Sequence, residues 1–436
     1  MTATIGPAGI AHRENGTPPP DVPLAEVRLD QLEFWGRDDD FRDGAFATLR
    51  REAPISFHDV PEVPGFPTGA GHWALTTHEH VHHASRHPEI FSSVPTSTAL
   101  NDTPVELAEF VGSMINLDDP RHQRLRSIVN RAFTPKVLTR IEESVRNRAR
   151  RLVDDLIAGH PDGQADFVTA VAGPLPLQVI CDMMGIPEED EPKIFHWTTV
   201  LLGAGDPEVA HDFEEVVAAG SDLAAYGIAL AESRRSTPTD DLTSNLVHAE
   251  VDGERLHSEE VASFFILLSA AGNETTRNAI SHGMVALSRY PEQREIWWND
   301  FAAVAPSAVE EIVRWASPVI FMRRNLTRDI ELGGVAMQAG DKVSMWYNSA
   351  NRDERKFANP WMFDVTRDPN PHVGYGGGGV HFCLGANLAR REVRVAFDEL
   401  RTRVPDIVAV EEPAILTSAF IHGIKRLPVA WTPPPG

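Results

Sequence analysis

The sequence predicts a mainly α-helical protein with a helix-rich body and a small β-rich region. Three observations indicate this: apolar residues recur at helical spacing in long segments, short β-like stretches are grouped after residue 328, and no linker divides the chain. A single domain is therefore expected over residues 23–436. Residues 1–22 are rich in Pro, Gly and polar side chains, which predicts a mobile lead-in.

Terminal signals place three helices. Thr134 as the N-cap and Pro135 at the first helical position predict a helix that ends at Gly159. A second helix is predicted over Pro176–Met184, where a glycine follows, and a third over Ala386–Val404. The amphipathic pattern of these segments predicts a body in which helices pack against one another through their apolar faces.

The longest predicted helix begins at Ser258 and meets no strong breaker before Tyr290 and the proline after it. At 1.5 Å per residue it spans about 50 Å, which is enough to cross a domain. Its middle is apolar except for the stretch Gly272–Thr276. Because polar groups inside a buried helix lose hydration, these residues should face a cavity, water or a ligand.

Short β-like stretches form the smaller region. They are bounded by glycines and turn residues, and they lie at Asp329–Leu332, Lys342–Trp346 and, in pieces, Ile415–Trp431. The β-rich region is therefore predicted from the last part of the domain.

Composition narrows the possible partners. The net charge of -23 argues against nucleic acid and anionic membranes, because both attract positive charge. Two cysteines in 436 residues exclude a disulfide framework and favour the cytoplasm. The N-terminus lacks the pattern of a signal peptide. The longest largely apolar run, Val261–Gly272, is shorter than the roughly 20 residues of a membrane span, so no membrane span is expected.

The strongest chemical motif is a glycine loop, residues 374–385, that delivers Cys383 to the start of a helix. Helix-terminal amides stabilise an anion, so the sulfur can persist as a thiolate, which is a suitable axial ligand for haem iron. A dinucleotide fingerprint is not supported, because a proline-containing stretch and not a strand precedes the glycines. Zinc would need more ligands than His381 and Cys383. On this segment alone, a flexible loop with a buried cysteine remains an alternative.

Together with four other motifs, this loop resembles the cytochrome P450 family over roughly residues 40–431. The others, in chain order, are His122 with Arg126, the central-helix motif of residues 271–276, Glu311 with Arg314, and Arg367 within residues 363–367. The resemblance implies a haem-thiolate monooxygenase with haem b bound between the long central helix and the helix that follows Cys383. It also identifies Cys383 as the axial ligand of the iron.

The resemblance also implies roles for the remaining site residues. Glu274 and Thr275 would deliver protons during dioxygen activation; the alternative is a helix kink satisfied by back-bonding of the threonine hydroxyl. Glu311, Arg314 and Arg367 would form a buried structural cluster. The other expected cofactor-binding residues are the propionate partners His122, Arg126, Arg324 and His381, and the loop glycines Gly376 and Gly385. Most family members have an aromatic residue seven positions before the cysteine, where this chain has Gly376, so the path of the loop stays open.

The expected substrate is an apolar lipid. Five candidate wall segments are dominated by apolar residues: 91–115, 196–205, 264–272, 319–322 and 418–423. Residues 52–57, the central helix from Phe264 to its end, and residues 381–399 with 421–424 resemble the mycobacterial methyl-branched lipid omega-hydroxylases. That resemblance implies hydroxylation of a terminal methyl group. A sterol side-chain hydroxylase is the alternative, and a haem-thiolate gas sensor or isomerase is a more remote one.

Three further interpretations concern the surface and the core. Because the sequence shows no reductase domain, electrons are expected from a ferredoxin and its NAD(P)H ferredoxin reductase. A cationic docking surface is predicted from Arg121, Arg124 and Arg131 together with Arg390, Arg391 and Arg394. The histidines between His78 and His87 are interpreted as solvated surface, and Cys181 as an inert core thiol.

Overall fold

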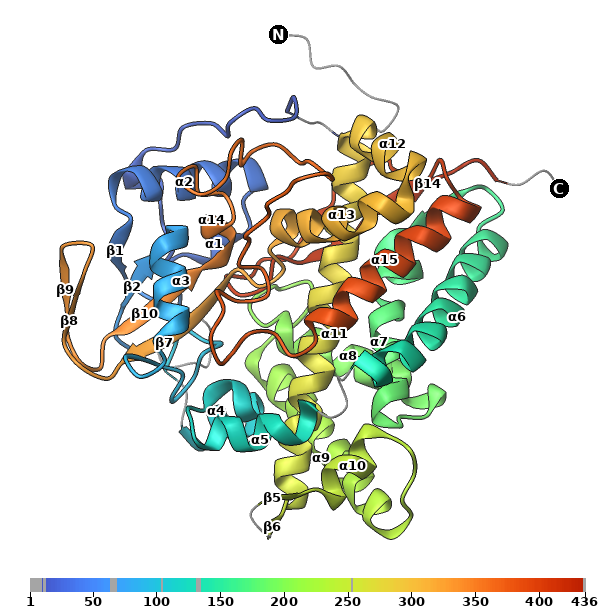
Figure 1. The fold of residues 1–436 in the computed structure, drawn as a ribbon, viewed down its shortest axis with the longest axis horizontal. Helices are drawn as coiled ribbons and strands as arrows, with labels where there is room; N and C mark the ends of the chain where they lie inside the picture. The colour runs from blue at the N-terminus through green and yellow to red at the C-terminus, as the bar shows by residue number, and fades with distance from the viewer. Residues whose placement is uncertain are drawn as a thin grey trace.

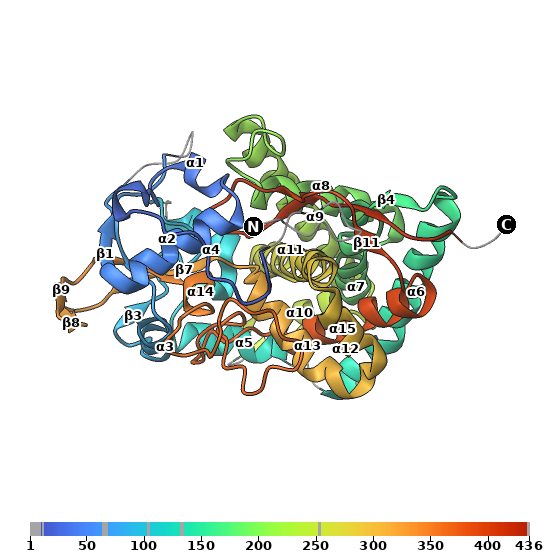
Figure 2. The same cartoon turned by 90° about the horizontal axis from the view of Figure 1, so that it is seen from above.

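The computed structural model describes residues 10, 13–62, 69–102, 105–130, 135–251 and 254–433. Helices surround one long central helix, and the main sheet lies to one side of this bundle (Figures 1 and 2). The α-helices of the described residues are α1 Leu32–Trp35, α2 Asp39–Glu52, α3 His78–Arg86, α4 Val105–Gly112, α5 Arg121–Asn130, α6 Pro135–Gly159, α7 Pro174–Met184, α8 Glu191–Leu202, α9 Phe213–Ser236, α10 Leu242–His248, α11 Ser258–Arg289, α12 Pro291–Asn299, α13 Phe301–Ala316, α14 Tyr347–Ala350 and α15 Ala386–Arg403.

Strands are short and are spread over five small sheets. They are β1 Ile55–His58, β2 His72–Leu75, β3 Phe91–Ser92, β4 Gln164–Asp166, β5 Glu250–Val251, β6 Glu254–Arg255, β7 Phe321–Leu326, β8 Ile330–Leu332, β9 Val335–Met337, β10 Lys342–Trp346, β11 Val408–Ala409, β12 Ala414–Ile415, β13 Ile424–Arg426 and β14 Pro428–Ala430. The predicted class, mainly helical with a small β content, is confirmed.

The predicted central helix is α11, and it begins and ends where its capping signals indicate. The carboxylate of Glu260 accepts a hydrogen bond of 3.0 Å from the backbone amide of His257, which satisfies a donor at the helix start. Tyr290 and a proline follow its last residue. Most side chains of α11 are buried against α4, α7, α9, α13 and α15, so this helix is the axis of the core.

The largest sheet has the strand order β1-β2-β10-β7-β3. Strand β10 matches the predicted stretch residue for residue; it runs parallel to β2 and antiparallel to β7. The predicted Asp329–Leu332 stretch is β8, which forms a hairpin with β9. Strands β1 and β2 were not predicted. They form an antiparallel pair with each other, and β2 also pairs with β10, about 270 residues further along the chain, where His72 pairs with Lys342.

The N-terminal segment is described only in part, since residues 1–9 and 11–12 lie outside the described residues. Within the rest of the predicted lead-in, the amide group of Asn15 donates to the carbonyl of Phe363 at 2.9 Å and accepts from its N–H at 2.8 Å. Val22 is buried. This part of the chain is therefore anchored to the body.

None of the described helices is long and apolar enough to cross a membrane. The apolar middle of α11 is covered by neighbouring helices, as its interrupted pattern predicted.

Candidate active site

Cys383 lies three residues before the first residue of α15, where helix-terminal amides point at its sulfur. Burial raises the pKa of Cys383, but hydrogen bonds from the Gly385 and Ala386 amides and the positive charge of Arg126 oppose that rise. The residue nevertheless keeps accessible surface, although the protein closely surrounds it. A soft sulfur ligand with amide support, open on one side, fits the iron of a haem.

The path of the glycine loop is set by helix α3. The hydroxyl of Ser85 donates to the Gly378 carbonyl at 2.8 Å, and a Cβ added at Gly379 would lie 2.3 Å from the carbonyl oxygen of Ser85. Gly379 also has φ of +82°. Across the loop, the Cys383 amide donates to the Tyr375 carbonyl at 2.9 Å. The loop, which has Gly376 where most family members have an aromatic residue, is thus accommodated by close packing on α3. Tyr375 retains a backbone contact with Cys383.

A cluster of nitrogen donors lies beside the loop. The rings of His122, on α5, and His381 are 4.1 Å apart, and His381 contacts the hydroxyl of Ser93 at 3.0 Å. The buried Nε2 of His122 has no hydrogen-bond partner among the described residues. Arg324, on β7, is 4% exposed and forms no ion pair with a described carboxylate. A buried cation without an anion is costly, so the cluster fits the two carboxylates of a haem.

The charge of this cluster comes from its arginines. Burial and the neighbouring charge of Arg324 lower the pKa of His381 to about 2, so its imidazole is neutral at pH 7. The guanidinium of Arg126 donates to the Phe382 carbonyl, directly before the cysteine. The predicted residues His122, Arg126, Arg324 and His381 therefore lie around one loop, although they come from α5, β7 and the loop itself.

The polar break in α11 divides into two faces. The Thr275 hydroxyl donates to the Ala271 carbonyl at 2.8 Å, and both residues keep accessible surface in the middle of a buried helix. Glu274 instead points into the protein, where it pairs with Arg277 at 2.6 Å and accepts from Thr199 at 3.5 Å. Burial raises the pKa of Glu274 despite the charge of Arg277. The two predicted catalytic residues thus occupy different environments.

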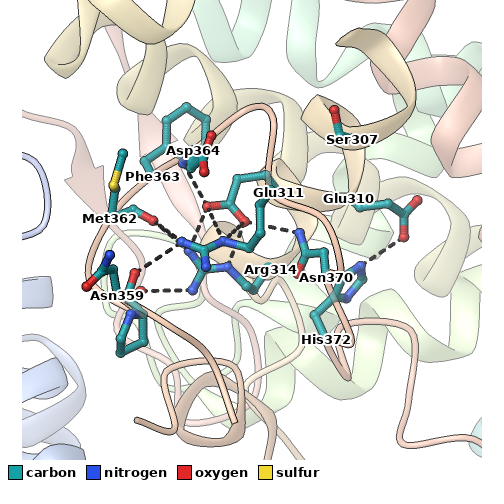
Figure 3. Close-up of polar contacts among 12 residues, drawn as sticks. Ser307, Glu310, Glu311, Arg314, Asn359, Met362, Phe363, Asp364, Asn370 and His372 are labelled. Atoms are coloured by element: carbon teal, nitrogen blue, oxygen red, sulfur yellow. Dashed lines mark hydrogen bonds and ion pairs between the residues drawn. The ribbon is translucent and has the colours of Figure 1, made fainter. Parts of the chain in front are cut away.

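The predicted structural cluster is present and buried (Figure 3). Glu311 accepts two bonds of 2.7 Å from Arg314, and both residues have no exposed side-chain surface. Arg367 approaches the same carboxylate at 3.1 and 3.2 Å. Both arginines also donate to backbone carbonyls of the segment 351–362. The cluster therefore fixes the chain that leads toward the cysteine loop.

Contacts connect the predicted wall segments in two groups. On α11, the two residues that flank the segment 264–272 reach other segments: Ser263 donates to the Phe110 carbonyl, and Asn273 contacts Thr198 at 3.5 Å. In the second group, the segment 319–322 joins the segment 418–423 through a β-bridge between Val319 and Ile421. Segments far apart in sequence are therefore placed together, as an apolar substrate pocket requires.

Two predictions about histidines and cysteines have different outcomes. Cys181 is fully buried, and burial raises its pKa, so the core-thiol prediction is confirmed. The solvated-surface prediction is wrong for His78, which is 7% exposed and whose Nε2 contacts the Pro371 carbonyl at 2.8 Å, whereas the other histidines of the group are half-buried. His83 and His87 are half-buried, with rings 4.2 Å apart. Packing of α3 against the sheet and the glycine loop covers them, which the local sequence could not indicate.

The predicted cationic surface is partly neutralised. Arg391 and Arg394 both pair with Glu142 of α6, and Arg390 pairs with Glu310. Arg131 lies outside the described residues. The charges after Cys383 are therefore engaged with acidic neighbours and do not form an unpaired patch.

Some polar groups near the site were not anticipated. Glu310 lies directly before Glu311 in the sequence and binds His372 at 2.9 Å as well as Arg390, whose guanidinium lies 4.5 Å above the Tyr375 ring. Glu392 of α15 is buried, and burial raises its pKa well above the usual range despite a hydrogen bond from Thr276. The only signal for these residues in the sequence was their position in helices that lie next to recognised motifs.

Comparisons with known proteins agree with this geometry. A profile of the cytochrome P450 family matches residues 302–400. Methyl-branched lipid omega-hydroxylase of Mycobacterium tuberculosis is 69% identical over 423 residues, covering 97% of this chain and 99% of that protein. Steroid C26-monooxygenase of the same species is 39% identical over 432 residues, covering 97% and 96%. A Mycobacterium marinum cytochrome P450 in complex with pseudoionone has a TM-score of 0.89 at 41% identity, covering 94% of this chain and 99% of that one.

The fold and the cysteine site thus define a haem-thiolate type of enzyme, and the chain belongs to the cytochrome P450 family. It is a P450 monooxygenase, and membership of the family implies haem. Among these relatives, the similarity is greatest to the methyl-branched lipid omega-hydroxylase.

Proposed function

We propose that this enzyme hydroxylates the terminal methyl group of methyl-branched fatty or isoprenoid chains in the cytoplasm. The observation that carries the proposal is 69% identity to methyl-branched lipid omega-hydroxylase over nearly the full length of both chains. Sterol side-chain hydroxylation is the second candidate, because the steroid C26-monooxygenase matches the chain over a similar length at 39% identity. Both reactions act on the end of a branched apolar chain, so the two candidates differ in the body of the substrate.

Cys383 would bind the haem iron through its sulfur, and Arg126, Arg324, His122 and His381 would bind the haem carboxylates. When bound, a thiolate-ligated haem supplies the oxygen-activating chemistry. The protein's part is to hold the cofactor with these residues and to orient the lipid. Terminal attack requires a channel that presents only the chain end, which is a positioning effect.

Thr275 would hold and transfer a proton at its hydroxyl, since it lies on the open face of α11. Glu274 would act one step away, through rearrangement of its buried ion pair with Arg277. A carboxyl group whose pKa is raised by burial accepts and releases protons nearer to neutral pH than an exposed one. Because the two side chains lie in different environments, a proton path between them needs a side-chain movement or a water.

Electrons would come from a ferredoxin served by an NAD(P)H ferredoxin reductase. The face that carries Arg391 and Arg394 is the proposed docking site, with its net charge reduced by Glu142. Complementary charge chiefly raises the encounter rate, so this proposal concerns the speed of reduction.

The substrate proposal is tested by incubating the haem-loaded enzyme, with a ferredoxin and its reductase, with three lipids. They are a terminally methyl-branched fatty acid, a straight-chain fatty acid of the same length and cholest-4-en-3-one. We expect an ω-hydroxylated branched acid by mass spectrometry and the highest kcat/KM for that lipid. A higher kcat/KM for the steroid would establish the second candidate instead, and hydroxylation only within the chain would refute both.

The role of Thr275 is tested by Thr275→Ala, with Thr275→Ser as the matched control that retains the hydroxyl. Thr275→Ala should bind substrate as tightly as the parent but release more peroxide, because proton transfer of this kind contributes about 10²–10⁴-fold. Thr275→Ser should restore most product per electron. Equal product per electron for Thr275→Ala and the parent would contradict the assignment.

A further inference from the structure

A second cluster of metal-ligand side chains lies outside the cysteine site. Asp39 of α2, His282 of α11 and His422, two residues before β13, bring one ligand atom each to within 4.8 Å of one another. The two imidazole rings are 4.0 Å apart. Among the described residues, these three form the group of histidine, cysteine and acidic side chains close enough to share an ion.

Backbone carbonyls orient both histidines. The Nδ1 of His422 lies 2.5 Å from the Ala316 carbonyl, so Nδ1 carries the hydrogen and Nε2 faces Asp39 Oδ1 at 2.9 Å. The Nε2 of His282 donates to the carbonyl of His422 at 3.1 Å, which leaves its Nδ1 with a lone pair. A histidine that donates one N–H to a carbonyl and presents the other nitrogen is the usual arrangement of a metal ligand.

The polar contacts of Asp39 leave one of its carboxylate oxygens for an ion. Arg42 and His422 both bond Oδ1 of Asp39, and no described residue bonds Oδ2.

We infer that Asp39, His282 and His422 form a site for one divalent transition-metal ion of the zinc class. Two nitrogens and one oxygen, with a position left for water, are a ligand set that zinc accepts. Ligand bonds of about 2.0–2.2 Å place ligand atoms roughly 3.3 Å apart in a tetrahedron, so the side chains must close by up to about 1.5 Å. A pocket of about 610 Å³ lined by all three residues gives the ion and its water access.

The site would join three segments that are distant in sequence. Asp39 belongs to the first long helix, His282 to the central helix, and His422 to the turn that also carries Ile421, the partner of Val319 in the predicted substrate wall. A bound ion would therefore tie α2 and this turn to α11. The inference does not depend on the identity of the lipid substrate.

Zinc binding to the chelator-treated, haem-loaded protein tests the site by isothermal titration calorimetry. The variants are Asp39→Asn and His282→Gln. The matched control is His83→Gln, which disrupts the pair of His83 and His87, the other histidine pair at which zinc could bind. We expect one zinc per chain, with affinity at least about tenfold weaker in both site variants, because even outer partners of metal ligands contribute about 10–100-fold. The control should change affinity less than twofold. Equal affinity in the parent and both site variants, or loss only in His83→Gln, would overturn the inference.

Crystals of the unaltered protein soaked in zinc provide a second measurement that does not depend on variant folding. An anomalous peak at the zinc edge between Asp39, His282 and His422 is the expected result. A peak only at His83 and His87, or no peak at millimolar zinc, would refute the site.

Discussion

Glu311 is the carboxylate on which two buried arginines depend, and Glu311→Gln removes its charge while keeping its size. The side chain has no exposed surface and accepts bonds from Arg314 and Arg367 at 2.7–3.2 Å. Removing one partner of a buried ion pair costs about 3–5 kcal/mol, because the remaining charge is stranded. Glutamine retains one acceptor oxygen, and both arginines keep their backbone carbonyls, so we expect the lower end, about 3 kcal/mol. That loss is roughly a 100-fold change in the unfolding equilibrium.

Urea unfolding of the haem-loaded protein at pH 7, followed by far-ultraviolet circular dichroism, measures this loss as a shift of the midpoint multiplied by the slope. Glu295→Gln, at an exposed position of α12, is the matched control and should stay within about 0.5 kcal/mol of the parent. If Glu311→Gln were also within 0.5 kcal/mol, the carboxylate would not be what holds the two arginines. The explanation from stranded charge would then be refuted.

Cys383→Ser should lose the red-shifted carbon monoxide band of the reduced protein, whereas Cys181→Ser should keep it; retention of the band in Cys383→Ser would refute the ligand assignment. Burial opposes ionisation of Glu310, but bonds from His372 and Arg390 lower its pKa to about 2. Because the pKa of Glu310 in the folded protein is below its usual value of 4.5, the contribution of Glu310 to stability is complete above pH 4.5 and is lost as the pH falls toward 2. Acid denaturation should therefore begin at higher pH in Glu310→Gln, and superimposable acid profiles would contradict this. Arg391→Glu should slow stopped-flow reduction by a ferredoxin at low salt and leave substrate affinity unchanged; a rate equal to that of the parent would remove this face as the docking site.

Local sequence signals predicted those helices and strands whose first and last residues are determined by neighbouring residues in the sequence. The limits of α11, the last residue of α7 and the first residue of α15 follow from caps, glycines and prolines, and β10 from a short apolar run beside a turn. Strands β1 and β2 carry equally short runs, but they join the main sheet because β2 pairs with both β1 and β10. Such pairing depends on contacts across hundreds of residues, which no local pattern contains.

The same distinction applies to the sites. Cys383 and the Glu311–Arg314 pair were predicted because each lies within one loop or one helix, where the spacing of residues in the sequence determines their relative positions. Glu274 and Thr275 were found by the polar break, but their opposite orientations depend on what packs against each face of α11. The cluster of Asp39, His282 and His422 has no fixed spacing, since its members are separated by more than a hundred residues and meet only in the folded chain.

Buried charged groups in this protein are compensated in three ways, and the third concerns the proposed cofactor site. Glu311 and Arg314 neutralise one another within the chain. Burial raises the pKa of Glu392 well above its usual range, which favours the neutral form of the carboxyl group. Arg324 has neither solution, because a guanidinium does not release its proton near neutral pH and no described carboxylate pairs with it. Since a buried charge without an ion-pair partner is destabilising, the position of Arg324 beside the Cys383 loop supports the proposal that an anionic group from outside the chain completes the site. The carboxylates of a haem, whose iron Cys383 can bind, satisfy both requirements with one molecule.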